Sequence, residues 1–191
     1  MTLKLGVHWF RQDLRLVNNP SLEILSERVD EIIPIFIIDP KQKIGSTSKW
    51  WLEQSLISLS DNIKKKIGKL NIFEGDPFDI ISSLILDKTI KSFYWNRLYD
   101  PYSILRDKKI KSFLRSSDVD CETFNGYLLN EPWEIKNKSG SFFKVFTPYW
   151  RHCNELTRNR KFVKKTHNIK LYKFSIKKSK KIQDLNLTNK K

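Results

Sequence analysis

The sequence predicts an α/β fold, namely a Rossmann-like, doubly wound sheet of five parallel strands with helices on both faces. Short apolar runs alternate with longer amphipathic segments along residues 3–124, which is the pattern of successive βαβ units. The run at 31–38 is apolar almost throughout, as in a central parallel strand that is buried on both faces. The length of 191 residues suits one such domain with an appendage.

The first strand and the first helix are predicted at the N-terminal end of the chain. Residues 3–10 form the first strand-like run. Asn19 suits a helix N-cap and Pro20 suits the first helical position, so we expect a helix from there to about residue 28. The second strand follows at 31–38.

A long helix is predicted after the second strand, opening at Ser46 or Ser48. Its apolar side chains recur every three or four residues, as on one face of an α-helix. Lysines from Lys64 onward complement the negative end of the helix dipole, and Gly68 ends the helix. A short third strand is expected at 70–74.

The second half of the chain repeats the alternation of helices and strands. Gly75, Asp76 and Pro77 form a turn that starts a helix to about residue 86. The remaining expected elements are a strand at 90–95, a helix at 102–116, a strand at 119–124, a loop at 125–141 and a helix at 147–156.

The net charge of +15 is concentrated at the C-terminal end of the chain. Residues 158–191 hold 13 Lys and Arg against the single acid Asp184, whereas residues 1–157 are nearly balanced. We therefore predict an α/β domain at 1–157 and a Lys-rich linker or disordered tail at 158–191. Weak binding of DNA or RNA phosphates by this tail, through counterion release, stays open as an alternative.

The composition argues against several classes of function. Two cysteines are too few for a disulfide scaffold, and with the three histidines they show no zinc-ligand spacing, so no metal site is predicted. The longest apolar run, 32–38, is too short to cross a bilayer and contains Pro34. No signal-peptide cleavage site is expected, so the protein is predicted to be soluble and cytoplasmic, without a membrane partner. No Ser-His-Asp or Cys-His nucleophile pattern occurs, and no catalytic residue is predicted.

Three loops are the expected ligand-binding region, because doubly wound folds bind ligands at the carboxyl ends of their strands. These loops begin at Arg11, Asp39 and Asn96. None of them contains the GxGxxG dinucleotide fingerprint or the GxxxxGK[ST] phosphate loop. A ligand would therefore need other contacts.

Several motifs occur in a characteristic order along residues 3–156. The first is the segment 9–16 (WFRQDLRL), which is followed two residues later by the triplet 18–20 (NNP). The later motifs are 38–40 (IDP), 48–52 (SKWWL), 74–77 (EGDP), 94–97 (YWNR), 99–102 (YDPY), 106–107 (RD), 128–129 (LL), 131–133 (EPW), 138–140 (KSG) and 144–150 (KVFTPYW). Together these motifs closely resemble those of the DNA photolyase and cryptochrome family.

The resemblance implies a division of labour between two domains. In this family the N-terminal α/β domain carries an antenna chromophore, which in many members is of the methenyltetrahydrofolate or 8-hydroxydeazaflavin type, and a helical C-terminal domain holds FAD and the damaged pyrimidine pair. This chain resembles the N-terminal half of a deoxyribodipyrimidine photo-lyase and is expected to end at about the interdomain linker. FAD is therefore expected only in the missing C-terminal domain, which would be the partner of this chain. DNA would be bound by the full-length protein, and the chain alone is expected to be inactive as a lyase.

Two alternatives to a repair enzyme stay open. A cryptochrome-like blue-light photoreceptor module shares every motif given above. A freestanding Rossmann-like protein that binds nucleic acid or another ligand would use the Lys-rich tail. For a chain without its helical partner, we also expect an exposed apolar patch formed by Phe142, Phe143, Phe146, Tyr149 and Trp150.

Aromatic side chains near two strand ends are the first candidates for chromophore contacts. Trp9 and Phe10 end the first strand, and Trp50 and Trp51 begin the long helix. Such side chains supply flat apolar walls for a conjugated ring. Ordinary core packing is the alternative for each of them.

A charge cluster just past the first strand provides another candidate. Arg11 is expected to face the chromophore, whereas a structural salt-bridge network with Asp13 and Arg15 is the alternative reading of the same residues.

Polar side chains in the other two loops complete the set of candidate contacts. Asn96, Arg97 and Asp100 follow the fourth strand, where they can hydrogen-bond the edge of a pterin or a deazaflavin. Asp39, at the second loop, and Lys49, beside the helix-opening tryptophans, are expected to join them.

Overall fold

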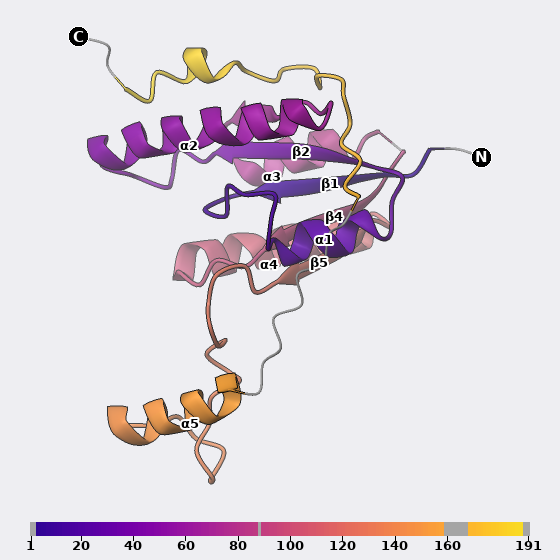
Figure 1. The fold of residues 1–191 in the computed structure, drawn as a ribbon. Helices are drawn as coiled ribbons and strands as arrows, with labels where there is room; N and C mark the ends of the chain where they lie inside the picture. The colour runs from indigo at the N-terminus through magenta and orange to yellow at the C-terminus, as the bar shows by residue number, and fades with distance from the viewer. Residues whose placement is uncertain (1–2, 88, 159–167, 189–191) are drawn as a thin grey trace. The chain divides into compact units, whose positions relative to one another are not determined.

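The computed structural model describes residues 3–87, 89–158 and 168–188 (Figure 1). No helix within these ranges is long and apolar enough to span a membrane.

The described residues fall into two compact units. One lies within Met1–Gly126 and His167–Lys191, and the other lies within Tyr127–Thr166. The division thus falls after Gly126, whereas the sequence predicted one domain over residues 1–157. The first unit holds the whole sheet.

A parallel five-stranded sheet forms the centre of the first unit, with the strand order β3-β2-β1-β4-β5 (Figure 1). Its strands are β1 (Leu5–Phe10), β2 (Glu31–Ile38), β3 (Asn71–Glu74), β4 (Ile90–Asn96) and β5 (Asp120–Phe124). β1 and β2 pair without a shift, so that Trp9 lies opposite Ile35 and Phe10 opposite Phe36. Both strands therefore end at the same edge of the sheet.

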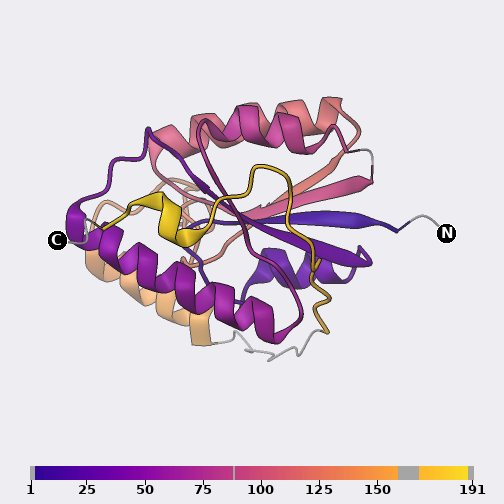
Figure 2. The same cartoon turned by 90° about the horizontal axis from the view of Figure 1, so that it is seen from above.

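Helices cover both faces of the sheet, which confirms the predicted fold class (Figure 2). The helices of this unit are α1 (Pro20–Ser26), α2 (Ser46–Lys65), α3 (Pro77–Leu84), α4 (Pro101–Ser116) and the short 3₁₀ helix η1 (Ile182–Leu185). α1 and α2 pack on one face, and α3 and α4 pack on the other. Because side chains alternate along a strand, Trp9 enters the α3–α4 core and Phe10 enters the α1–α2 core.

Three helices begin with the same two-residue capping motif, an Asn or Asp followed by proline. Asn19 caps α1, Asp76 caps α3 and Asp100 caps α4, and each side chain accepts a hydrogen bond from a backbone N–H of the first turn. The following proline has no N–H to leave unpaired and is preset for helical geometry. The predicted start of the first helix at Asn19 and Pro20 is confirmed.

The described C-terminal residues lie first along the edge of the sheet, at 168–180, and then against α2, where η1 packs (Figure 1). Tyr172 N donates to Ile32 O at 2.7 Å on β2, and Lys180 N donates to Ile72 O at 2.7 Å on β3. The buried side chains that this segment adds to the α1–α2 core are Ile169, Leu171 and Leu185. The described part of the predicted Lys-rich tail is therefore packed, and it covers backbone groups that β2 and β3 would otherwise expose.

The second unit contains α5 (Phe146–Arg158) and the loops before it. Within α5, Phe146 and Trp150 stack with an interplanar angle of 10°. The side chain of Phe143 packs against Tyr149 and His152. The members of the expected apolar patch that are exposed are Phe142, Phe146, Tyr149 and Trp150, and Phe143 is partly exposed.

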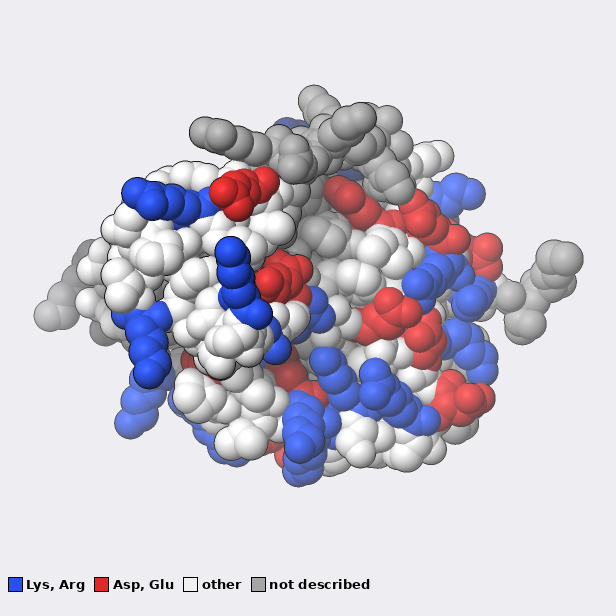
Figure 3. All heavy atoms as spheres, turned by 90° about the horizontal axis from the view of Figure 1, so that it is seen from below, with Lys and Arg blue, Asp and Glu red and all other residues white. Residues whose placement is uncertain are grey.

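Charged side chains of both signs occur together on the face drawn in Figure 3, where acidic groups lie next to basic ones. Elsewhere in the first unit, Lys180 and Glu74 form an ion pair.

Candidate functional site

A cavity of about 740 Å³ lies at the carboxyl ends of β1 and β2, beside the first turns of α2. Its apolar lining includes Trp9 from β1, Phe36 and Ile38 from β2, and Trp51 and Leu52 from α2. This edge of the sheet is where doubly wound folds bind their ligands. The volume lies within the range of about 300–1,000 Å³ that is usual for small-molecule sites.

About half of the residues that line the cavity are polar or charged, and they come from separate parts of the chain. Arg11 and Arg15 belong to the loop after β1, Asp39 and Gln42 to the loop after β2, and Arg106 to α4. Apolar walls together with polar groups in fixed places are the usual features of a site for a flat organic ligand.

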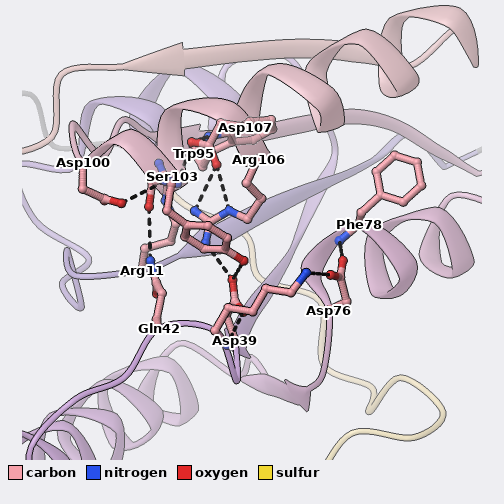
Figure 4. Close-up of polar contacts among 12 residues, drawn as sticks. Arg11, Asp39, Gln42, Asp76, Phe78, Trp95, Asp100, Ser103, Arg106 and Asp107 are labelled. Atoms are coloured by element: carbon pink, nitrogen blue, oxygen red, sulfur yellow. Dashed lines mark hydrogen bonds and ion pairs between the residues drawn. The ribbon is translucent and has the colours of Figure 1, made fainter.

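Three of these charged groups, Arg11, Asp39 and Arg106, form a buried ion cluster with Asp107, which lies behind the cavity wall (Figure 4). Arg11 Nη1 lies 2.7 Å from Asp107 Oδ2, Arg106 Nη2 lies 3.0 Å from Asp107 Oδ1, and Arg106 Nη1 lies 3.1 Å from Asp39 Oδ2. Every one of the four side chains is less than a tenth exposed. Burial lowers the pKa of Arg11, and the neighbouring Asp107 opposes that effect. The two carboxylates thus neutralise the two guanidinium groups away from water.

Trp9 lies at the centre of this cluster. The guanidinium carbons of Arg11 and Arg106 are each 5.0 Å from the centre of its ring, within the range of cation–π attraction. On the neighbouring strand, Trp95 Nε1 donates to Asp107 Oδ2 at 2.9 Å. The tryptophans and the ion pairs therefore fix one another at the carboxyl ends of β1 and β4.

Asp39 is held from three sides, which fixes its carboxylate beside the cavity. Tyr102 Oη donates to Asp39 Oδ2 at 2.7 Å, and Lys41 N donates to Asp39 Oδ1 at 3.0 Å. The third partner is Arg106. Burial, with help from Asp39, raises the pKa of Tyr102 to about 12, so its hydroxyl stays a donor at neutral pH. Nearby, Gln42 Nε2 donates to Ser103 Oγ at 3.1 Å (Figure 4).

A second buried polar network lies behind the loop that follows β1. Asn96 Nδ2 donates to Asp13 Oδ2 at 2.5 Å and to Asn19 Oδ1 at 2.7 Å, and Arg11 N donates to Asp13 Oδ1 at 2.9 Å. The chain passes so close at Gly126 that a Cβ there would lie 2.4 Å from Asn96 Cβ. These residues join α1, β4 and the loop, and Asp13, Asn19 and Asn96 are not among the side chains that line the cavity.

Two of the eight predicted contact residues, Arg11 and Asp39, line the cavity, together with the expected wall residues Trp9 and Trp51. Phe10 does not, because it is completely buried in the α1–α2 core.

The other predicted contacts lie elsewhere. Trp50 lines a different hollow, between α2 and the C-terminal segment, and Lys49 is exposed. Asn96 belongs to the polar network described above. Arg97 donates to Thr123 on β5, and Asp100 caps α4.

Arg106 and Gln42 are cavity residues that were not predicted. Arg106 belongs to the motif at 106–107, but its position at the cavity depends on how α4 packs against the sheet. Gln42 lies three residues beyond Asp39, in the loop that follows the second strand. Its place in that predicted ligand-binding loop was the sequence signal that could have identified it.

No group of three or more potential metal ligands occurs among the residues that the structure describes. His8 is completely buried and its Nε2 lies 2.7 Å from Ser21 Oγ. Burial lowers its pKa to about 4, so it is neutral at physiological pH.

Comparison with known sequences matches residues 6–168 to a family described as DNA photolyase. The deoxyribodipyrimidine photo-lyase of Agrobacterium fabrum is 37% identical over 154 residues, which are 79% of this chain and 32% of the relative. Cryptochrome-2 of Arabidopsis thaliana is 33% identical over 159 residues, which are 81% of this chain and 26% of the relative. The chain thus spans about a third or less of the length of these relatives.

Solved structures show the same fold. A bacterial class III photolyase from Agrobacterium tumefaciens superposes with a TM-score of 0.87 and 30% identity, covering 98% of this chain and 39% of that structure. An archaeal photolyase from Sulfolobus tokodaii, described with two FAD molecules and an implied novel light-harvesting cofactor, superposes with a TM-score of 0.80 and 26% identity. That match covers 95% of this chain and 40% of the archaeal structure.

Proposed function

Because this chain belongs to the DNA photolyase family, as its N-terminal domain, we propose that the cavity binds a light-harvesting antenna chromophore. Methenyltetrahydrofolate and 8-hydroxydeazaflavin are the two types that we propose. The observation that carries this proposal is the cavity itself, which has the volume, the apolar walls and the strand-end position of a site for a flat ligand.

The lining fits a conjugated ring that has a polar edge. Phe36, Trp51 and Leu52 offer apolar contact to the faces of such a ring. Asp39 accepts three hydrogen bonds from the protein, and its carboxylate has about four acceptor positions, so one remains for an N–H group of a ligand. When bound, the chromophore supplies absorption of light and transfer of the excitation energy. The residues of this chain bind the ring, orient it and keep water away from it.

We further propose that the domain works with a helical, FAD-binding partner in the light-dependent repair of cyclobutane pyrimidine dimers in DNA. Support comes from the photo-lyases among the relatives, in which the matched segment makes up about a third of the chain. No residue of this chain is proposed to be catalytic. DNA binding is assigned to the whole protein, with at most a weak contribution from the Lys-rich C-terminal residues.

A photoreceptor role is the second candidate, because cryptochrome-2 of Arabidopsis thaliana is 33% identical to this chain. The two roles differ in chemistry. The chain is combined with the FAD-binding part of its protein, and thymine dimers in an oligonucleotide are counted before and after illumination. Loss of dimers favours repair, and their persistence in the presence of bound, reduced FAD favours the photoreceptor.

Filling the cavity tests the proposed chromophore site. Ser55 lines the cavity from α2, and Ser55→Trp places a large ring in the space proposed for the chromophore. The matched control is Ser83→Trp, which adds the same side chain at an exposed position of α3. Fluorescence titrations with each chromophore should show at least about a tenfold loss of affinity in the first variant, since the bound ring must give up most of its apolar contacts.

The control variant should bind like the natural sequence. If neither chromophore binds the natural sequence, or if Ser55→Trp binds as tightly as Ser83→Trp, the cavity is not the antenna site.

A further inference from the structure

The charges around the cavity do not balance. Arg11, Arg15 and Arg106 line it, whereas Asp39 is the lining acid among the described residues. Asp107, just behind the wall, joins Asp39 in neutralising Arg11 and Arg106. Two arginines and two aspartates thus form the closed ion cluster, and Arg15 stands outside it.

Arg15 makes no ion pair with any residue that the structure describes. Its Nε donates to Asn18 O at 3.1 Å, and its Nη2 donates to Gly126 O. Both acceptors are neutral backbone carbonyls, and Nη1 has no partner among the described residues. The nearest acid in the sequence, Asp13, is buried and accepts hydrogen bonds from Asn19 and Asn96.

The two carbonyls also fix where the guanidinium group lies. Asn18 belongs to the same loop and has a left-handed backbone, with φ of 52°, whereas Gly126 follows β5. Arg15 is thereby tied to two segments that are far apart in the sequence. A partly buried cation that is held in place, with its Nη1 group free to donate, is arranged to bind an oxyanion at little further cost in side-chain entropy.

We infer that the ligand of this cavity carries an oxyanion, a carboxylate or a phosphate, and that Arg15 binds it while the apolar walls hold the ring. The inference rests on the proposed antenna function and narrows it to chromophores that have an acidic tail. Arg15 is then the residue that distinguishes them from forms of the same ring with an uncharged tail. Arg11 and Arg106 cannot take this role, because their charges are already paired.

Two pairs of probes separate the oxyanion from the ring. The first pair is 8-hydroxy-5-deazariboflavin with and without a 5′-phosphate. The second is methenyltetrahydrofolate with free glutamate carboxylates and as the diamide. In each pair, the form whose tail carries the oxyanion is called the anionic probe, and the form whose tail is uncharged is called the neutral probe. For the ring that binds, the anionic probe should bind the natural sequence at least about tenfold more tightly, as expected for one charge-assisted hydrogen bond in a partly buried site.

Variants at Arg15 test whether this residue causes the preference. Arg15→Gln should lower the affinity for the anionic probe to that for the neutral probe, while the affinity for the neutral probe stays unchanged. Arg15→Lys should restore part of the preference, because it keeps the charge. Lys65→Gln, which removes an exposed charge from the other end of α2, should change neither affinity.

Thermal unfolding of each variant shows whether the binding data come from folded protein. If Arg15→Gln does not fold, the salt dependence of the natural sequence decides. The preference for the anionic probe should then shrink as salt rises, since it arises from one partly exposed charge.

The outcomes separate this inference from the proposed function. Equal binding of the anionic and neutral probes by the natural sequence, or a preference that survives in folded Arg15→Gln, overturns the inference and leaves the antenna site standing. Failure of both rings to bind removes the antenna site, and the inference with it.

Discussion

Replacing Asp107 with Asn tests whether the ion cluster at the cavity wall is maintained by charge. The carboxylate accepts hydrogen bonds from Arg11 Nη1 at 2.7 Å, from Trp95 Nε1 at 2.9 Å, and from Arg106 Nε and Nη2 at 3.1 and 3.0 Å. Asn has nearly the same shape but is neutral, and its NH₂ group faces donors. Two buried guanidinium groups would then share the single charge of Asp39. Removing one partner from a buried ion pair costs about 3–5 kcal/mol, so we expect a loss of that size in the free energy of unfolding.

Urea unfolding followed by tryptophan fluorescence measures this loss. The matched control is Asp118→Asn, an exposed residue with φ of 57°, where Asn is well tolerated and the expected change is within about 0.5 kcal/mol. Adding Arg11→Met to the Asp107 variant should recover part of the loss, because one uncompensated charge is removed. A loss for Asp107→Asn no larger than that for the control would refute the electrostatic account of the cluster.

Three further predictions concern other parts of the first unit. Burial lowers the pKa of His8 from its ordinary 6.5 to about 4. Between these two pH values the unfolded chain therefore binds more protons than the folded chain, and the free energy of unfolding falls as the pH falls. By pH 4 the free energy of unfolding, measured by urea titration, should have fallen by roughly 3 kcal/mol more in the natural sequence than in His8→Gln. Identical pH dependence of the two free energies would contradict this. Gly126→Ala places a Cβ 2.4 Å from Asn96 Cβ and should lower the free energy of unfolding by about 1–3 kcal/mol. Gly45→Ala, with open space around it at the N-cap of α2, should lower it by less than about 1 kcal/mol. Leu171→Ala should cost about 2–5 kcal/mol by chemical unfolding, because that side chain lies in the core, and a change under about 0.5 kcal/mol would mean that the segment is not docked.

The main features of the fold could be predicted from the sequence because they depend on local signals. The apolar run of β2 indicated a central strand, and Asn19 with Pro20 indicated the start of α1. The packing of the C-terminal residues was not predicted, since the few apolar side chains, such as Ile169 and Leu171, lie among many lysines. Because lysines dominate this segment, its few apolar residues did not form a recognisable pattern, although they are the side chains that pack it against the core.

The candidate site could be predicted only where strand direction alone decides the position. Arg11 and Asp39 follow strands that end at the same edge of the sheet, so both lie at the cavity. The partner of Arg11, Asp107, lies 96 residues further along the chain, and no local pattern connects them. Which of two adjacent aromatic residues faces the cavity also depends on packing, since neighbours on a strand point to opposite faces and neighbours on a helix diverge. Trp51 lines the cavity and Trp50 does not.

The binding of an antenna chromophore in the cavity is most directly tested by a crystal structure of this chain with the chromophore that it binds most tightly. We predict that the ring lies between the ends of β1 and β2 and the first turns of α2, in contact with Trp51 and Leu52. Its acidic tail should lie within hydrogen-bonding distance of Arg15. A ring found elsewhere, such as in the hollow beside Trp50, or a cavity without the ring in crystals that contain the chromophore, would contradict the proposed function.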